Sequence, residues 1–228
     1  MNKERTILWV TATGAEASVL GTSSVLDLGY YPGFQRLNDG LLITGPGLLA
    51  SSAELTALLA TYHFDAIIHF GIAGSFLQDY PPGTVVQVVT EELGDFGADN
   101  RGVFIPAFDL KLANPDQHPF RSGILQPEIP SGLDTNLPHV HGTTVHTVHG
   151  SAAAIDQFRN RSSAAVESME GAAVFYAAIR KGVPCLQLRA ISNWVEPRNR
   201  DAWEIGKALE ALKSEIILLQ QKITAGSS

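Results

Sequence analysis

Residues Asp65–Ser75 read DAIIHFGIAGS, an apolar run that ends in a series of small residues. The first part, Asp65–Phe70, predicts a buried β-strand because the run is short and strongly apolar. The small residues of Gly71–Ser75 would let backbone N–H groups approach a flat ligand, although an ordinary turn has the same composition. We therefore expect a strand that leads into a candidate ligand-binding loop.

Short apolar runs alternate with helix-length segments on both sides of this strand. Further strands are expected at Thr6–Val10, Leu41–Thr44, Thr84–Thr90, Thr143–Val148, Ala164–Val166 and Cys185–Ile191. Helices are expected from near Ala15 and at Leu48–Tyr62, Ser151–Asn160, Glu170–Lys181 and Asp201–Ile223. Residues 109–140 are rich in Pro, Asn, Asp and Gly, which favours a long loop. This order predicts one three-layer α/β domain over residues 1–228, with a central mixed, largely parallel sheet flanked by helices.

Ligands of such folds bind beyond the carboxyl ends of the strands. The loops expected at that edge are Thr11–Ala15, Gly45–Gly47, Gly71–Ser75, Glu91–Gly97, Glu167–Glu170 and Ser192–Arg200. None of them has the spacing G-x-G-x-x-G of a dinucleotide site, and the chain has no G-x-x-x-x-G-K-[ST] motif. Dinucleotide binding and ATP chemistry are therefore disfavoured.

The composition narrows the class of ligand. Of 228 residues, 45% are hydrophobic and 17% charged, an ordinary globular balance, and the formal charge of -7 argues against nucleic acid or anionic membranes as partners. No run approaches the roughly 18 apolar residues of a membrane span. The single cysteine, Cys185, excludes an intrachain disulfide and is expected in the core. We expect a soluble cytoplasmic protein that acts on a small molecule.

Val166–Ala173, with the sequence VESMEGAA, carries two carboxylates where a predicted strand passes into a predicted helix. The simple interpretation is that Glu170 complements the positive N-terminal end of the helix. If Glu170 instead faces the ligand edge, its carboxylate can accept both hydrogen bonds of a vicinal diol. The thioether of Met169 can then lie against the apolar face of a sugar. The segment thus favours a ribose site.

Arg189–Arg200, with the sequence RAISNWVEPRNR, is a predicted buried strand that runs into a polar loop. Taken singly, Arg198 and Arg200 would be solvated surface charges and Asn193 a turn residue. The presence of Met169 and Glu170 at a neighbouring strand end favours a ligand-binding role for this loop, because both segments are expected at the same edge of the sheet.

Three parts of the chain together resemble the methylthioadenosine/S-adenosylhomocysteine nucleosidases and the hexameric-type purine nucleoside phosphorylases. They are Gly71–Ser75, Met169–Ala173, and Arg189–Ser192 with the following Asn193. The resemblance covers nearly the whole chain and implies a nucleoside-phosphorylase-like fold. A longer pattern resembles the futalosine hydrolases of the alternative menaquinone pathway, and it comprises Ser168–Ala172, Ser192–Asn193, Pro197–Arg198, Arg200 and Trp203. It implies a purine nucleoside N-ribosyl hydrolase that releases hypoxanthine from futalosine.

The resemblance also implies a role for each matching residue. Glu170 is expected to hold the ribose hydroxyls, with Met169 under the sugar and Ser168 as a further substrate contact. Glu16 lies where the nucleosidases keep the carboxylate that activates water. Ala73–Gly74 is expected to support the purine.

Asn193 lies where the adenosine nucleosidases have an aspartate that protonates purine N7. A neutral amide is no general acid, but its NH2 donates and its C=O accepts hydrogen bonds, which suits a 6-oxopurine such as hypoxanthine. The flipped amide offers the opposite pattern, which suits adenine. Phe96 and Phe104 are candidates for the pocket wall, although phenylalanine is more often a core residue. Arg198 and Arg200 are the candidate cations for the carboxylate on the 5′ side of futalosine.

The segment after the first strand favours hydrolysis over phosphorolysis. Thr11–Glu16 contains no arginine to bind phosphate and carries an acid that would repel it. Ile72 stands where relatives often place a serine. The alternative enzymes are a methylthioadenosine/S-adenosylhomocysteine nucleosidase and a purine nucleoside phosphorylase. A nucleoside-binding protein of the same fold is the non-enzyme alternative, and the presence of Glu16 argues against it, because binding alone needs no water-activating acid.

Four histidines, His139, His141, His146 and His149, lie close together in the sequence. Two are expected in a loop and two in a strand, at a spacing of three that would point them to opposite faces. No ligand set for a metal emerges, and hydrogen-bonded or solvated histidines are the simpler interpretation. We expect neither a metal nor an organic cofactor. The family resemblance alone implies a homodimer or a higher homo-oligomer.

Overall fold

A mixed eight-stranded β-sheet forms the centre of the computed structural model, which describes residues 5–21, 35–36 and 40–226. The sheet order is β10-β5-β8-β9-β4-β1-β3-β2, and β10 also pairs with β4. Its strands are β1 (Ile7–Thr11), β2 (Gln35–Arg36), β3 (Gly40–Ile43), β4 (Ala66–Ser75), β5 (Val85–Leu93), β8 (His139–Thr144), β9 (Val166–Ser168) and β10 (Cys185–Trp194). A separate hairpin consists of β6 (Gly97–Asn100) and β7 (Val103–Pro106).

The pairing between β4 and β10 closes part of the sheet into a ring that runs β4-β10-β5-β8-β9 and back to β4. The strands β4 and β10 run parallel, and their pairing extends to Trp194 opposite Ser75. On the other side of β4, β9 runs antiparallel and places Glu167 opposite Gly74. The pairs β5–β10 and β2–β3 are also antiparallel, and the other pairs of this sheet are parallel. The expectation of a mixed, largely parallel sheet is confirmed.

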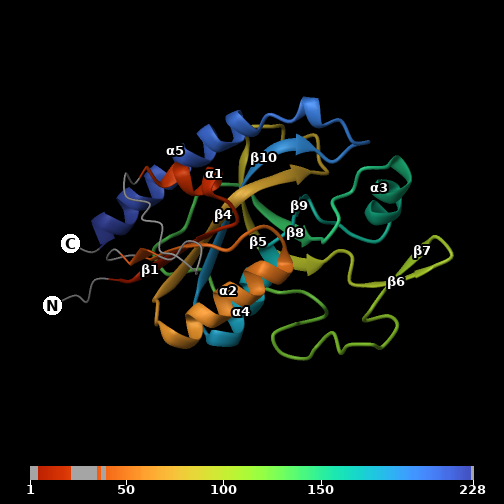
Figure 1. Ribbon diagram of the computed structural model, residues 1–228, viewed down its shortest axis with the longest axis horizontal. Helices are drawn as coiled ribbons and strands as arrows, with labels where there is room; N and C mark the ends of the chain where they lie inside the picture. Colours follow the sequence, from red (N-terminus) through yellow and green to blue (C-terminus); the bar gives the residue numbers. More distant parts are fainter. Residues whose placement is uncertain (1–4, 22–34, 37–39, 227–228) are drawn as a thin grey trace.

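Helices cover both faces of the sheet (Figure 1). The helices are α1 (Gly14–Ala17), α2 (Leu48–Thr61), α3 (Ala152–Arg159), α4 (Gly171–Lys181) and α5 (Ile205–Gly226), with short 3₁₀ turns η1 (Ser18–Leu20) and η2 (Arg200–Ala202). In Figure 1, α1 and α5 lie on one side of the sheet and α2 and α4 on the other, while the β6–β7 hairpin projects from the end opposite to the termini. This is the three-layer arrangement that the sequence predicts.

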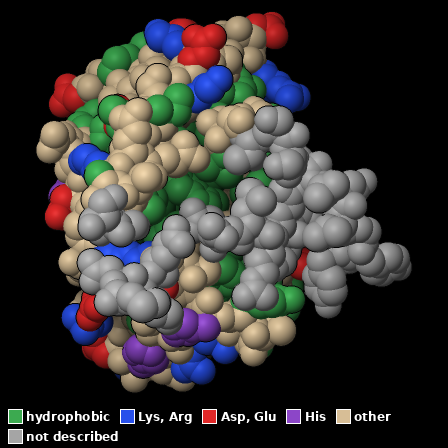
Figure 2. Space-filling view, turned by 90° about the vertical axis from the view of Figure 1, so that its left-hand side faces the viewer, with side chains coloured by type: hydrophobic (Ala, Val, Ile, Leu, Met, Phe, Trp, Pro, Cys, Tyr) green, Lys and Arg blue, Asp and Glu red, His purple; other side chains and the backbone are tan. Residues whose placement is uncertain are grey.

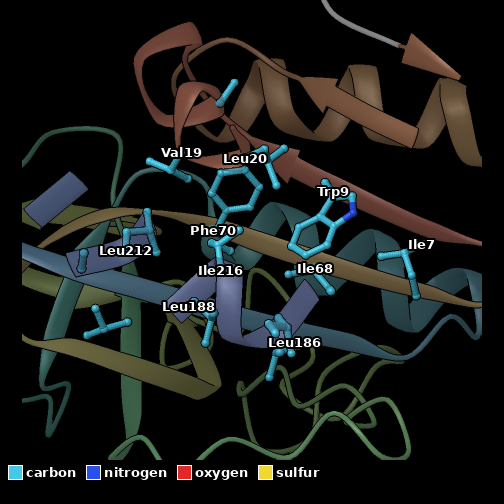
Figure 3. Close-up of a cluster of buried hydrophobic side chains, with 14 of the residues drawn as sticks. Ile7, Trp9, Val19, Leu20, Ile68, Phe70, Leu186, Leu188, Leu212 and Ile216 are labelled. Carbon is cyan, nitrogen blue, oxygen red and sulfur yellow. The ribbon is translucent and has the colours of Figure 1, made fainter. Parts of the chain in front are cut away.

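A hydrophobic core fills the space between α5 and the sheet. Phe70 of β4 and Leu188 of β10 pack with Leu212 and Ile216 of α5 (Figure 3). Trp9 of β1 meets Phe70 edge to face, with ring centroids 6.1 Å apart and an interplanar angle of 72°. Such buried aromatic pairs add to the free energy of burial and fix the relative position of the strands.

A second core lies between the sheet and the pair of helices α2 and α4. It contains Leu55 of α2, Val174 and Phe175 of α4, and Cys185 at the start of β10. The expectation that Cys185 is a core residue is confirmed. Burial raises the pKa of its thiol, so this cysteine stays protonated and is a poor nucleophile.

Two strands continue beyond their expected ends. The strand β4 includes Gly71–Ser75 and β10 includes Ser192–Trp194, so both segments belong to the sheet instead of to loops. The reason is ring closure, because the last residues of β4 pair with β10 on one side and with β9 on the other. Glu91 and Glu167 likewise lie inside strands, in β5 and β9. Local sequence patterns contain no signal for such long-range pairings.

The expectation of a strand at Thr143–Val148 is wrong, because β8 spans His139–Thr144. Pairing with β5 sets this position, with His139 opposite Gln87. His139 and His141 therefore lie on the strand and the later two histidines follow it, the reverse of the expectation. The β6–β7 hairpin was not expected either, because the four residues of β6 are polar or small and fully exposed and give no strand signal.

Other local predictions hold. Helix α4 ends at Gly182, whose φ of 66° is the left-handed conformation that favours glycine. Between β7 and β8 the chain forms no helix or strand apart from isolated bridges, as expected from its Pro, Asn, Asp and Gly content. Leu125 and Leu133 of this long loop are nevertheless buried and anchor it to the core.

The described surface carries charges of both signs. In Figure 2, acidic and basic side chains are interspersed around a central hydrophobic area at the end of the molecule that faces the viewer. None of the described helices combines the length and the apolarity that a membrane crossing requires.

Candidate active site

A cavity of about 380 Å³ lies at the ends of β1, β4, β9 and β10, next to the starts of α4 and α5. The loop after β1 contributes Glu16, β4 contributes Ile72–Gly74, the junction of β9 and α4 contributes Glu167–Glu170, and β10 contributes Ser192 and Asn193. Among the described residues that line it, three are glutamates and none is lysine or arginine. The described lining therefore supplies no Lys or Arg side chain to a bound anionic group.

Glu16 is held at the cavity by hydrogen bonds to both of its carboxylate oxygens. The N-cap residue of α1, Thr13, forms a capping box with it, donating its N–H to Glu16 Oε2 at 3.0 Å. The hydroxyls of Thr11 and Thr13 donate to the same oxygen at 3.1 and 2.8 Å. Glu16 Oε1 accepts from the N–H of Ile72 in β4 at 3.0 Å. These charge-assisted hydrogen bonds fix the direction of the carboxylate.

Glu170 is the buried N-cap residue of α4. Its Oε1 accepts a hydrogen bond of 2.8 Å from the N–H of Gly47, in the turn that follows β3. Gly47 has a φ of 93°, so a side chain there would strain the turn that orients the glutamate. Met169 and Ser168 line the cavity beside Glu170. The structure thus brings the expected ribose-binding residues into the same cavity as Glu16.

Arg189 lies between the two glutamates and is 1% exposed. Its Nη2 is 3.8 Å from Glu170 Oε2. A Cβ on Gly71 would lie 2.5 Å from Arg189 Nη1 and 2.6 Å from Glu16 Oε1, so both groups approach the backbone of β4 at this glycine. Arg189 was not among the residues expected at the site, although a charged residue inside an apolar strand is an available signal. The structure makes it the buried cation that neighbours both carboxylates.

A chain of buried polar residues continues from Arg189 away from the cavity. Arg189 Nη2 donates to His69 Nε2 at 3.1 Å, His69 Nδ1 donates to Gln187 Oε1 at 2.8 Å, and Gln187 Nε2 donates to Glu91 Oε1 at 2.7 Å. Burial and the charge of Arg189 lower the pKa of His69 well below its usual value, so this ring is neutral. Burial raises the pKa of Glu91 to about 7, against hydrogen bonds from Gln187 and Thr144.

Asn193 lines the cavity near the end of β10, next to Gly74 of β4. Its Oδ1 accepts from the Ser192 hydroxyl at 2.8 Å, and its Nδ2 donates to the Trp194 carbonyl at 2.8 Å. These two bonds set the amide so that one N–H of Nδ2 is left for a ligand. Asn193 is therefore arranged as a hydrogen-bond donor toward the cavity.

Comparison with known proteins places this geometry in a family. The model of the Phosphorylase superfamily matches residues 35–222. The chain belongs to the phosphorylase superfamily. It is 35% identical over 195 residues to a futalosine hydrolase of Streptomyces coelicolor, covering 79% of each chain. It is 36% identical over 178 residues to a futalosine hydrolase of Acidothermus cellulolyticus, covering 76% of this chain and 71% of the relative.

Solved structures of this superfamily share the fold. A Helicobacter pylori methylthioadenosine nucleosidase mutant with 5′-methylthioadenosine in its active site matches with a TM-score of 0.76 at 17% identity, over 96% of this chain and 99% of the other. The native futalosine hydrolase of Helicobacter pylori matches with a TM-score of 0.74 at 16% identity, over 98% of each. The family resemblance and the fold inferred from the sequence are confirmed, and the names of these proteins agree with the expected N-glycosyl hydrolase.

Four residues that were candidates for the site lie outside the cavity lining, namely Phe96, Phe104, Arg198 and Arg200. Phe96 is 44% exposed and meets Phe108 edge to face, with ring centroids 5.9 Å apart. It follows β5 at a point where the chain turns toward the β6–β7 hairpin, so the expectation that it lines the pocket is corrected. Arg198 is exposed, and its guanidinium lies 5.7 Å from the ring centroid of Trp203, which does line the cavity.

His149 and Glu167 also line the cavity. Neither was expected to contact the substrate, although Glu167–Glu170 was expected at the ligand edge. Glu167 Oε1 accepts from the backbone N–H of His149 at 3.0 Å, and its Oε2 forms a short contact with His149 Nδ1. The contact joins positions 18 residues apart, so no local spacing reveals it. The apolar side chains of Ile205 and Leu209, at the start of α5, were missed for the same reason.

The four clustered histidines do not form a metal centre. Among the described residues no group of three or more His, Cys, Asp or Glu side chains is placed to hold a metal ion. His141 pairs with Glu92, with Nε2 3.5 Å from Oε2, and His149 pairs with Glu167. Although burial opposes it, the hydrogen bond to Glu92 raises the pKa of His141. Both histidines are thus held by separate carboxylates.

Proposed function

We propose that the chain is a purine nucleoside N-ribosyl hydrolase whose substrate is futalosine. The observation that carries the proposal is the meeting of Glu16, Glu170 and Asn193 in the lining of one cavity. The futalosine hydrolases at 35% and 36% identity support the choice of substrate. The products are hypoxanthine and dehypoxanthine futalosine, which puts the reaction in the alternative menaquinone pathway.

The ribose is bound by Glu170 and Met169. A buried carboxylate oriented by Gly47 accepts hydrogen bonds from the 2′ and 3′ hydroxyls without having to reorganise. Met169 lies beside it in the lining and offers an apolar surface to the sugar ring. Arg189, 3.8 Å from Glu170, keeps a compensating positive charge beneath the carboxylate. This arrangement fixes C1′ relative to Glu16.

Glu16 activates the water that attacks C1′. Its carboxylate is held by four hydrogen bonds from Thr11, Thr13 and Ile72, so it faces the substrate in one orientation. Positive charge that develops on the sugar in the transition state is stabilised by this carboxylate and by Glu170. The lining has no Lys or Arg among its described residues and carries three glutamates, which disfavours a phosphate ion as the nucleophile.

The purine lies against Ala73–Gly74 and is contacted by Asn193. The free N–H of Asn193 Nδ2 donates to N7 or to the 6-oxo group, both of which accept hydrogen bonds in hypoxanthine. An amide oriented in this way contributes recognition and no proton. The choice of a 6-oxopurine over adenine follows from this donor together with the names of the relatives.

The 5′ substituent extends toward the start of α5. Trp203, Ile205 and Leu209 give this part of the cavity an apolar wall suited to an aromatic ring. Arg198 lies over Trp203 and supplies the positive charge for the benzoate carboxylate of futalosine. From resemblance alone we also propose a cytoplasmic homodimer or higher homo-oligomer.

The test is base release from futalosine, inosine, methylthioadenosine and adenosylhomocysteine, each with and without phosphate. The proposal expects hypoxanthine from futalosine at the same rate with and without phosphate. Release of adenine from the thioether nucleosides at a higher rate would overturn the substrate. Strict dependence on phosphate would overturn hydrolysis and the role of Glu16.

A further inference from the structure

The departing purine needs a proton that Asn193 does not have. Breaking the C1′–N9 bond puts negative charge on the base, and a positioned general acid contributes about 10²–10⁴-fold to such steps. Asn193 is a neutral amide, while Glu16 and Glu170 already serve the water and the ribose. If the chain is the proposed hydrolase, on which this subsection rests, the residues assigned so far leave the donor of this proton open, and another side chain of the cavity is a candidate.

His149 is the histidine among the described residues that line the cavity, and Glu167 holds it in place. Glu167 is 4% exposed in its side chain and uses both oxygens on this residue, accepting from the backbone N–H at 3.0 Å and meeting ring Nδ1. A carboxylate against Nδ1 fixes a proton on that nitrogen and sets the orientation of the ring. The pair has the arrangement of an oriented acid.

Neighbouring rings hold the imidazole of His149 in one position, and one of its nitrogens makes no hydrogen bond to the described residues. It lies tilted against Phe158, with centroids 4.7 Å apart, and edge-on to Phe76 at 6.0 Å. Its side chain is 12% exposed, and Nε2 has no hydrogen-bond partner within the described part of the chain. A ring that lines a cavity with one nitrogen engaged and the other free is available to a ligand.

The pair lies where the base is proposed to bind. Glu167 is opposite Gly74 across β9 and β4, and Gly74 is opposite Asn193 across β4 and β10. Glu167 and Asn193 therefore flank Gly74, each one strand spacing of about 4.8 Å away. A base lying on Ala73–Gly74 has Asn193 on one side and the His149–Glu167 pair on the other.

We infer that His149, oriented by Glu167, is the general acid that protonates the departing purine. The C1′–N9 bond breaks and its electron pair goes to the base, which takes the proton from His149 Nε2. Water forms the new C1′–O bond and gives one proton to Glu16. Glu16 then releases its proton to solvent, and His149 Nε2 takes up a proton from solvent. In total one water is consumed and one neutral base is released.

The charges around His149 come from several elements. Glu167 of β9 touches the ring, and Asp95 accepts the N–H groups of His146 and Thr147 in the same loop. Arg161 lies over the Phe158 ring at 4.8 Å, and the Arg198 N–H donates to Gly150 at 3.0 Å. The only one of these groups bonded to the imidazole among the described residues is Glu167.

The test compares two leaving groups in wild type and His149→Asn. Asparagine keeps a donor near Nδ1 for Glu167 and removes Nε2. Hydrolysis of futalosine should lose about 10²–10⁴-fold in kcat. Hydrolysis of N7-methylfutalosine, whose base is already cationic and leaves without a proton, should change by no more than about threefold. His141→Asn is the matched control, since His141 pairs with Glu92 outside the cavity lining and should leave both rates unchanged.

The pH profile of kcat on futalosine gives an independent readout. In wild type, kcat should fall at high pH as His149 loses its proton, and in His149→Asn this limb should disappear. Glu167→Gln should move the limb to lower pH, because the imidazolium loses its counter-charge. If wild type does not hydrolyse N7-methylfutalosine, the pH profiles of kcat alone test the role of His149.

Equal loss on both substrates with the alkaline limb retained would overturn the role of His149 and leave it a packing residue. An unchanged kcat in His149→Asn would do the same. If wild type releases no base from any nucleoside of the panel, it is the proposed function that fails.

Discussion

Glu16 Oε1 accepts a hydrogen bond of 3.0 Å from the backbone N–H of Ile72. This bond ties the first turn after β1 to β4, the strand that pairs with β1, β9 and β10. The carboxylate is therefore positioned by the sheet itself and not by a mobile loop. Sites held on regular elements keep their geometry better than sites on loops.

Glu16→Gln should strongly lower kcat and spare substrate binding. The amide keeps the size of the side chain but is a poor base, so kcat for hypoxanthine release should fall by about 10²–10⁴-fold. The dissociation constant of futalosine, measured by calorimetry, should change by less than about fivefold, a bound of about 1 kcal/mol. Glu210→Gln on the exposed side of α5 is the control and should behave as wild type. A kcat in Glu16→Gln that stays near that of wild type would refute the mechanism.

Gly71→Ala should damage stability and catalysis together. The new Cβ would come within 2.5 Å of Arg189 Nη1 and 2.6 Å of Glu16 Oε1, so both groups must move. Overpacking of this kind costs about 1–3 kcal/mol, and displacement of Glu16 should lower kcat as well. Gly206→Ala in α5 meets nothing within 4 Å and should be neutral or slightly stabilising. Urea denaturation and base release measure the two effects, and an unaltered kcat in Gly71→Ala would be at odds with the close approach described.

Glu91→Gln should change how stability depends on pH. The pKa of Glu91 is about 7 in the folded protein against a usual 4.5, so between these values the folded state holds a proton that the unfolded chain has lost. The titration of Glu91 therefore makes the free energy of unfolding fall as pH rises through this range. Above the range, Glu91 no longer changes the free energy of unfolding with pH. The variant lacks this decline.

Measured by urea denaturation at about pH 5 and about pH 8, the variant should gain about 2–3 kcal/mol relative to wild type between the two conditions. Glu210→Gln, whose carboxylate is exposed, should show no such gain. A difference between Glu91→Gln and wild type that does not vary with pH would mean that Glu91 is ionised in the fold.

Arg198→Gln should affect substrates according to their 5′ group. The side chain is exposed and lies over Trp203, so its attraction for a carboxylate is screened and should be worth about twofold to fivefold in kcat/KM. The loss should appear with futalosine and be absent with inosine, which has no 5′ carboxylate. Arg200→Gln, two residues away in η2, is the matched control. Equal effects of the two variants would remove Arg198 from the substrate site.

Several site residues could be predicted because their signals are local. Met169 and Glu170 follow a short strand and precede a clear helix, so the strand-to-helix junction alone puts them at the ligand edge. Asn193 follows the apolar run of β10 in the same way. Glu16 had only the family resemblance in its favour, and its capping box with Thr13 shows the physical reason why a glutamate fits there.

Other residues could not be placed, because their roles depend on contacts between distant segments. His149 meets Glu167 only once β8 and β9 are paired, and Arg189 meets Glu16 only across Gly71 of β4. Phe96 was expected in the pocket because it follows β5, but the chain turns there toward the β6–β7 hairpin.

The alternation of apolar runs and helical segments was enough to predict a layered α/β protein with its ligands at the strand ends, because hydrophobic periodicity and helix caps are local properties. The closure of β4, β10, β5, β8 and β9 into a ring was not predictable from any segment, because it depends on the register between strands far apart in the sequence. That register brings Glu167, Gly74 and Asn193 into one row and gives the cavity its acid side chains. The chemistry of each residue is local, whereas their meeting in one cavity is a property of the folded sheet.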